Sequence, residues 1–277
     1  MDILVQNNDT QLFTTVHPNP GKETVILLHG GPGVPNGLTF VTKFLQQDFQ
    51  VVLFHQRGTL KSPTLGQNYA FDNYISDINA IADYLKLDKF HLFGHSWGGL
   101  YAQVYAQKNP HKLLSLFLCS PGSGTGRQWK EAMLEIAHYN KVKCNLKEWL
   151  AMNINSALGL LGSDQAYNNF YRQALANFSR GFQESYPELF AIDCIKAKAI
   201  NQTTKAILKY PLLPEIIVPG FKITLTYGDK DIFGDSKKYV LQRYPTAMVS
   251  FIPDSGHIPW SHNQPAFIKI LKDHYKI

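Results

Sequence analysis

The sequence predicts an α/β protein with a mainly parallel sheet, flanking helices and an inserted all-helical cap. Short apolar runs recur between turn signals, and helical patterns lie between these runs. One long central stretch carries helical patterns and no convincing strand. These three observations divide the chain into a core, residues 1–120 and 214–277, and a helical cap, residues 121–213.

Continuous apolar runs mark the predicted strands. Because these runs do not alternate with polar residues, we expect strands that are covered on both faces, as in a parallel sheet. Two earlier strands, 3–6 and 12–17, are expected to form an antiparallel edge. The central runs are 24–28, 50–54, 89–93, 113–119, 222–227 and 247–252.

Helical periodicity separates these strands. Apolar residues between positions 74 and 85 repeat at the spacing of one helix face. A second helix ends at Asn109-Pro110, because proline cannot continue it. A last helix is expected from Pro265 onward.

Three apolar stripes at helical spacing predict the cap, and such stripes commonly pack a cap on its core. Ligands of open α/β sheets bind at the carboxyl edge of the strands, so we expect the cap to cover a site there. The cap holds 11 Lys/Arg and 7 Asp/Glu, a balance that favours a solvated surface over a mild attraction for anionic substrates. The stripes are Trp129, Met133 and Ile136; Leu146, Leu150, Ile154 and Leu158; and Tyr167, Phe170, Tyr171, Ala174 and Phe178.

Composition excludes several classes of protein. Of the 277 residues, 44% are hydrophobic and 17% are charged, which suits a large core and argues against disorder. No apolar run approaches the roughly 18 residues of a membrane-spanning helix, and the N-terminus lacks a secretory pattern. A net charge of +6 without blocks of like charge gives nucleic-acid binding little support. Three dispersed cysteines fit a reducing compartment. We therefore expect a cytoplasmic protein without nucleic-acid or membrane partners, and the oligomeric state stays open.

The sharpest motif is G-x-S-x-G at Gly94–Gly98. It directly follows a predicted strand and opens a predicted helix, which is the context in which this motif presents a nucleophile. Such a turn holds the serine in strained backbone angles, and the helix N-terminus adds partial positive charge. Ser96 is therefore the candidate nucleophile.

A serine hydroxyl is a weak nucleophile and needs a base that is oriented by a carboxylate. His257 follows the last predicted strand, and Asp231 follows the strand before it, in the order serine, acid, histidine. Asp229 competes for the acid role, but the G-x-x-D spacing favours Asp231. The remaining histidines do not predict a metal site, and no cofactor is expected.

The glycine-rich segment His29–Gly33 follows the predicted strand 24–28. Glycines there leave backbone N–H groups open to a substrate oxygen. We expect the Gly31 and Trp97 N–H groups to form an oxyanion hole.

Together, HGGPG at 29–33, GHSWGG at 94–99, GDKD at 228–231 and SGH at 255–257 resemble the α/β-hydrolase superfamily. More narrowly, they resemble the proline iminopeptidase group, in which HGGPG and GxSWGG occur together. The resemblance covers the core. It implies a helical cap and removal of an N-terminal residue, typically proline, from peptides.

The sequence departs from that group at three places. Residues 55–62 read HQRGTLKS, where the group usually carries DQRGxGxS. The two cap glutamates that hold the substrate's free amine in that group correspond here to Asn153 and Asn168. A neutral amide replaces only part of the interaction between a carboxylate and an ammonium. With these two asparagines, Trp149, Phe170 and Tyr171 are expected to bind substrate.

The functional prediction is a serine hydrolase that cleaves a small amide, ester or peptide bond through an acyl-enzyme. Its partner is a small-molecule or short-peptide substrate. Three alternatives remain: a carboxylesterase or lactonase, an acyltransferase, and a non-enzymatic ligand-binding or sensor protein on the same scaffold.

Overall fold

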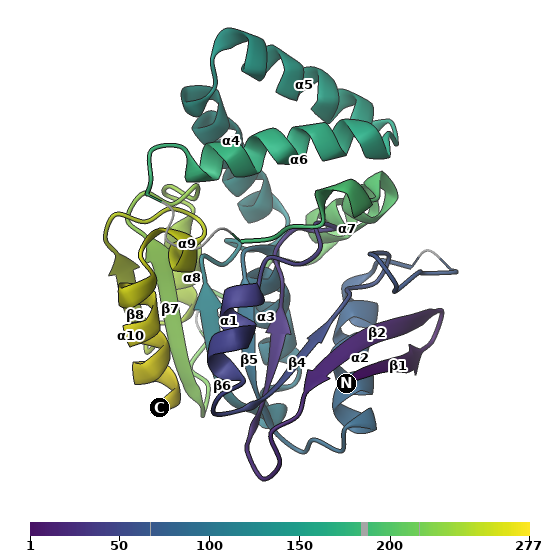
Figure 1. Ribbon diagram of the computed structural model, residues 1–277, viewed down its shortest axis with the longest axis vertical. Coiled ribbons are helices and arrows are strands. Elements are labelled where there is room, and N and C mark those ends of the chain that lie inside the picture. The colour runs from purple at the N-terminus through teal and green to yellow at the C-terminus, as the bar shows by residue number, and fades with distance from the viewer. Residues whose placement is uncertain (67, 184–187, 216) are drawn as a thin grey trace.

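An eight-stranded sheet forms the centre of the molecule (Figure 1). The computed structural model describes residues 1–66, 68–183, 188–215 and 217–277. The strands are β1 Asp2–Asn7, β2 Thr10–His17, β3 Thr24–Leu28, β4 Gln50–Phe54, β5 Phe90–His95, β6 Leu113–Cys119, β7 Lys222–Gly228 and β8 Met248–Ile252.

The strand order is β1-β2-β4-β3-β5-β6-β7-β8. β2 pairs with β1 and β4 in antiparallel register, and every other neighbouring pair is parallel. The predicted fold class and the antiparallel edge are confirmed. β3, β4 and β6 have the predicted bounds, while β5 extends two residues further than predicted, to His95.

Helices cover both faces of the sheet because the strand side chains alternate between two apolar layers. One layer packs against α2 Phe71–Tyr84, α3 Trp97–Lys108 and α8 Lys237–Arg243. The other packs against α1 Thr39–Leu45, α9 Pro259–His262 and α10 Gln264–Tyr275. Neighbouring β3 residues show the alternation, since Ile26 belongs to the first layer and Val25 and Leu27 to the second. Short 3₁₀ turns lie at Pro110–Lys112 and Ile192–Cys194.

Four helices lie between β6 and β7 in the chain and rise above the sheet (Figure 1). They are α4 Arg127–Lys143, α5 Leu146–Leu160, α6 Asp164–Ser179 and α7 Ala197–Lys209, and we call them the cap. The described residues of 121–213 contain no strand. None of the described helices is both long enough and apolar enough to span a bilayer.

One predicted apolar stripe of the cap does not pack on the core. Leu146, Leu150, Ile154 and Leu158 of α5 are 46–73% exposed. α5 turns its other face to α6, where a Cβ added at Gly159 would lie 2.4 Å from the Tyr167 ring. This close approach fixes the rotation of α5, so the leucine-rich face points outward.

A buried histidine links α10 to the sheet. His274 Nδ1 lies 2.7 Å from Thr224 Oγ1, and its Nε2 lies 2.7 Å from Ser115 Oγ. Burial lowers the pKa of His274 from 6.5 to about 3, and the nearby charges of Lys222 and His91 act in the same direction. The folded protein therefore holds this ring neutral.

This neutral ring predicts a pH-dependent stability. The unfolded chain takes up the His274 proton below pH 6.5, whereas the folded chain resists it until about pH 3. The contribution of His274 to the free energy of unfolding is therefore fully present above pH 6.5 and is lost as the pH falls from 6.5 towards 3. Between pH 7 and pH 5 the loss is about 2 kcal/mol. Urea unfolding at both pH values should show His274→Gln losing about 2 kcal/mol less than wild type; equal losses would contradict this assignment.

Candidate active site

Ser96 occupies a tight turn between β5 and α3. Its φ of 56° and ψ of −120° lie outside the helical and extended regions. Added Cβ atoms at Gly94 and Gly98 would lie 2.4 Å from the Gly98 carbonyl oxygen and 2.2 Å from the Leu28 carbonyl oxygen, respectively. Only glycines permit this close packing, so the two motif glycines allow the turn that presents the hydroxyl.

A hydrogen-bonded chain joins Ser96 to a histidine and a carboxylate. Ser96 Oγ lies 2.9 Å from His257 Nε2, and His257 Nδ1 lies 3.0 Å from Asp231 Oδ1. Both partners are buried, with His257 3% and Asp231 9% exposed. The structure thus brings the three predicted side chains together at the carboxyl edge of the sheet.

The surroundings of Asp231 keep it ionised. Burial by itself would raise the pKa of this carboxyl, but the facing His257 ring and two hydrogen bonds bring the pKa below its ordinary value. The Ser120 hydroxyl donates to Oδ2 at 2.6 Å, and the Phe233 N–H donates to Oδ1 at 3.2 Å. Asp229, the competing candidate, is exposed and accepts from the Ser255 N–H.

The predicted oxyanion loop lies beside the serine. A Cβ at Gly30 would lie 3.3 Å from Ser96 Cβ. Gly31 has a φ of 132°, and a Cβ there would meet the backbone nitrogens of Gly33 and Val34 at 2.8 and 2.9 Å. Trp97 is the first residue of α3. The loop and the start of α3 therefore place both candidate donors next to the candidate nucleophile.

Gln56, the Gln of the HQRGTLKS segment, connects these two donor segments, a role that the motif comparison does not predict. Its Nε2 donates to the His29 carbonyl at 3.0 Å, and the Trp97 Nε1–H donates to its Oε1 at 2.8 Å. The side chain is 2% exposed. One buried amide thus holds the oxyanion loop and α3 in a fixed relation.

Replacing Gln56 with leucine should therefore lower kcat more than it alters KM. A misplaced oxyanion donor costs about 10²-fold in kcat. Ester hydrolysis well below the unfolding temperature measures the effect. Gln128→Leu removes another buried amide, which accepts from Arg243, and should leave kcat within about threefold. A fall of equal size in both variants would contradict this role for Gln56.

His95 and Ser120 also support the site. His95 Nε2 donates to the His257 carbonyl at 2.8 Å, and burial lowers the pKa of His95 to about 3, so the ring stays neutral. Ser120 follows β6 and binds Asp231. The sequence signal for both is their position at the carboxyl end of a strand, a signal that many residues share.

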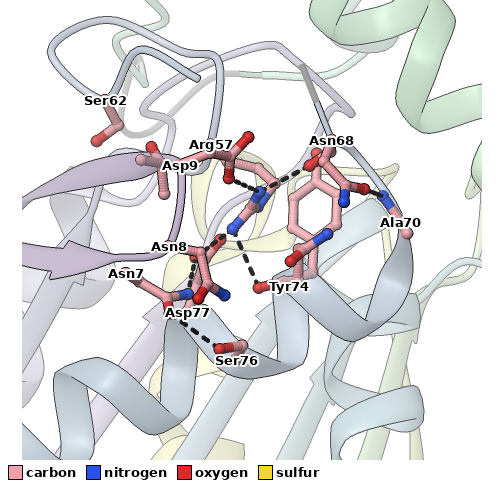
Figure 2. Close-up of polar contacts among 12 residues, drawn as sticks. Asn7, Asn8, Asp9, Arg57, Ser62, Asn68, Ala70, Tyr74, Ser76 and Asp77 are labelled. Atoms are coloured by element: carbon pink, nitrogen blue, oxygen red, sulfur yellow. Dashed lines mark hydrogen bonds and ion pairs between the residues drawn. The ribbon is translucent and has the colours of Figure 1, made fainter. Parts of the chain in front are cut away.

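The HQRGTLKS segment carries a buried ion pair (Figure 2). Arg57 binds Asp77 through two hydrogen bonds of 2.8 and 2.7 Å, and both side chains are 0% exposed. Arg57 also donates to the Asn68 carbonyl and Asp9, while Asn7 donates to Asp77. Because Gln56 precedes Arg57, this cluster anchors the residue that joins the donor segments.

The two departures in this segment have structural consequences. Leu60, where the resembled group has glycine, adopts a φ of 44° in the left-handed region. His55, where that group has aspartate, stacks on the Phe13 ring and accepts from the Lys61 N–H. Neither side chain contacts the three side chains of the hydrogen-bonded chain.

A cavity of about 640 Å³ lies over Ser96 and His257. The core contributes Gly31 and Phe233, and the cap contributes Trp129, Phe170 and Tyr171. The predicted residues Phe170 and Tyr171 thus line the cavity.

Three other predicted substrate-binding residues are absent from the described lining. Trp149 is half-buried on α5, and Asn153 is exposed and donates to the Trp149 carbonyl at 2.7 Å. Asn168 is buried, and its side-chain nitrogen faces the carbonyls of Ile192 and Asp164. Both amides thus serve the cap itself, which corrects the expected placement.

The described residues offer no cluster of three or more His, Cys, Asp or Glu side chains suited to a metal. The chain can supply a nucleophile, a base and an orienting carboxylate within hydrogen-bonding distance of one another.

Comparison with known proteins identifies the family. The α/β hydrolase fold family model matches residues 23–260, so the chain belongs to the α/β-hydrolase fold family. A solved structure of a hydrolase from Pseudomonas aeruginosa PA01 superimposes with a TM-score of 0.69 and 14% identity, and covers 100% of this chain and 98% of that one.

Within this family the chain groups with the proline iminopeptidases. It is 32% identical over 272 residues to a proline iminopeptidase of Clostridioides difficile (strain 630), covering 91% of this chain and 89% of that protein. It is 36% identical over 103 residues to a probable proline iminopeptidase of Leptolyngbya boryana. That second match covers 36% of this chain and spans about a third of the relative, 32% of its length.

Proposed function

We propose that this chain is a serine hydrolase that cleaves a small amide, ester or peptide bond through an acyl-enzyme. The observation that carries the proposal is the hydrogen-bonded chain from Ser96 through His257 to Asp231, which lies beneath a cavity. The membership of this chain in the α/β-hydrolase fold family supports the same reaction class.

In the first half-reaction, Ser96 Oγ attacks the substrate carbonyl while His257 Nε2 takes the hydroxyl proton. Asp231 accepts from Nδ1–H and stabilises the imidazolium. The Gly31 and Trp97 N–H groups bind the tetrahedral oxyanion. The carbonyl then re-forms, and the leaving alcohol or amine departs with the proton from His257.

In the second half-reaction, water attacks the acyl-enzyme. His257 removes a proton from the water, and the new tetrahedral intermediate expels Ser96, which recovers its proton from His257. The carboxylic acid product leaves, and the site returns to its starting state.

The similarity to proline iminopeptidases makes peptides with an N-terminal proline the first candidate substrates. The described cavity lining argues for a different preference, because it contains no Asp or Glu to pair with a free ammonium. We therefore propose that neutral esters and amides are better substrates than peptides with a free N-terminal proline. The three free cysteines favour a reducing, cytoplasmic compartment for this reaction.

Two substrates test the proposal. We expect turnover of p-nitrophenyl acetate and weak or no hydrolysis of L-proline β-naphthylamide. Efficient release of proline, with the N-acetylated analogue rejected, would overturn the proposed preference while keeping the serine chemistry. Failure to hydrolyse any ester or amide, by folded protein, would count against the enzyme itself and favour a ligand-binding role.

A further inference from the structure

The cavity wall begins at the proposed base itself. The Phe178 and Phe233 rings meet the His257 ring edge-on, with centroid separations of 5.4 and 5.3 Å. Both phenylalanines line the cavity, which continues to Trp129 and Ile136 of α4. A carbonyl carbon beside Ser96 therefore has an apolar surface directly next to it.

Three polar side chains of the lining, Asn140, Tyr167 and Asn201, are already hydrogen-bonded within the protein. Asn140 Nδ2 donates to the Ile136 carbonyl, and its Oδ1 accepts from Asn177. The Tyr167 hydroxyl donates to Asn201 Oδ1, and Asn201 Nδ2 donates to backbone carbonyls of α5. Because these three groups bond within the protein, and most of the other lining residues are apolar, the wall offers a ligand mainly apolar contact area.

No carboxylate lies in the described cavity lining, and the Asp231 carboxylate beside it is already hydrogen-bonded to His257. Lys205 and Lys209 of α7 line the cavity. An ammonium that enters loses its hydration and gains no counter-ion from these residues. An uncharged apolar chain meets none of these penalties and gains about 0.8 kcal/mol for each CH₂ buried, which corresponds to about fourfold in binding.

We propose that this cavity selects an uncharged, apolar acyl group of several carbons and excludes acyl groups that carry a free amine. This specificity rests on the proposed serine hydrolase function and assigns its substrate class. The acyl carbonyl binds at Ser96, and the chain extends along the aromatic and aliphatic wall beneath the cap.

A series of p-nitrophenyl esters tests the wild-type enzyme. From acetate through butyrate and hexanoate to octanoate, kcat/KM should rise by at least about 30-fold in all, since each well-buried methylene contributes about fourfold. The 6-aminohexanoate ester, which carries an ammonium on a chain of the same length, should fall at least about 100-fold below hexanoate. A flat profile, or equal rates for the two six-carbon esters, would overturn the proposal.

A matched pair of variants tests the position of the chain. Ala174 of α6 is 3% exposed and lines the cavity, whereas Ala176 on the same helix is exposed and outside the described lining. Ala174→Phe should lower the octanoate-to-acetate ratio of kcat/KM by at least about tenfold, because the new ring occupies part of the cavity. Ala176→Phe should leave this ratio within about twofold. Equal ratios in the two folded variants would overturn the proposed path of the chain.

The outcomes separate the two proposals. If acetate is hydrolysed in a Ser96-dependent way but kcat/KM does not rise with chain length, the proposed substrate class is wrong and the serine hydrolase function is retained. If folded wild-type protein hydrolyses neither the acetate nor the octanoate ester, the proposed serine hydrolase function is wrong. Should Ala174→Phe fail to fold, the wild-type ester series decides the substrate class by itself.

Discussion

His257→Ala is expected to lower kcat for ester hydrolysis by about 10⁴- to 10⁶-fold. The imidazole lies 2.9 Å from Ser96 Oγ and serves as both base and acid in the proposed reaction. Without it, the serine must lose its proton to water, and the leaving group departs unprotonated. The residual rate reports the oxyanion donors and substrate binding alone. Steady-state kinetics with p-nitrophenyl acetate, with folding checked by circular dichroism, measures the loss.

The two neighbouring acids supply a matched control. Asp231→Asn should cost about 10⁴-fold, because the amide cannot hold the imidazole in the required tautomer. Asp229→Asn removes an exposed carboxylate that accepts only from the loop N–H of Ser255 in the described contacts, so kcat should change less than about threefold. A larger loss in the Asp229 variant than in the Asp231 variant would reverse the assignment of the acid.

Arg57→Met is expected to lower the free energy of unfolding by about 3–5 kcal/mol. The guanidinium and the Asp77 carboxylate are both fully buried and joined by two hydrogen bonds (Figure 2). Removing the cation leaves a carboxylate without its ion-pair partner. Urea unfolding at neutral pH measures the loss.

Two further variants separate the buried pair from ordinary charge loss. Arg57→Met combined with Asp77→Leu should recover part of the stability, because no lone charge remains buried. The exposed pair Arg172–Asp193, 2.7 Å apart, provides the control, and Arg172→Met should change stability by less than about 1 kcal/mol. Equal effects of the Arg57 and Arg172 substitutions would show that burial adds nothing to this ion pair.

The sheet and the nucleophile turn were predictable because their signals are local. Continuous apolar runs mark β3, β4 and β6 with their observed bounds, since strands buried on both faces need apolar residues at every position. The G-x-S-x-G turn follows from the close approach of Gly94 and Gly98 to neighbouring backbone. The histidine and the acid follow from chain order, because the carboxyl ends of parallel strands meet at one edge.

The cap was less predictable because the rotation of its helices depends on contacts between distant residues. The periodicity of α5 indicates a helix and an apolar stripe, but Gly159 against Tyr167 decides that the stripe faces outward. Asn153 is exposed and bonds the Trp149 carbonyl, while Asn168 faces the Ile192 and Asp164 carbonyls, so neither belongs to the described cavity lining. The HQRGTLKS motif contains Gln56 but does not predict its role, because that role comes from joining His29 and Trp97, which lie far from it in sequence.

Mapping the site of an organophosphonate adduct tests the central claim most directly. The reagent reacts with a serine only where a base activates the hydroxyl and an oxyanion hole receives the phosphoryl oxygen. Peptide mass mapping of the treated wild-type protein should find one adduct, on Ser96, and treatment of His257→Ala should leave Ser96 largely unmodified. An unmodified Ser96 in folded protein, with ester turnover intact after treatment, would contradict the account.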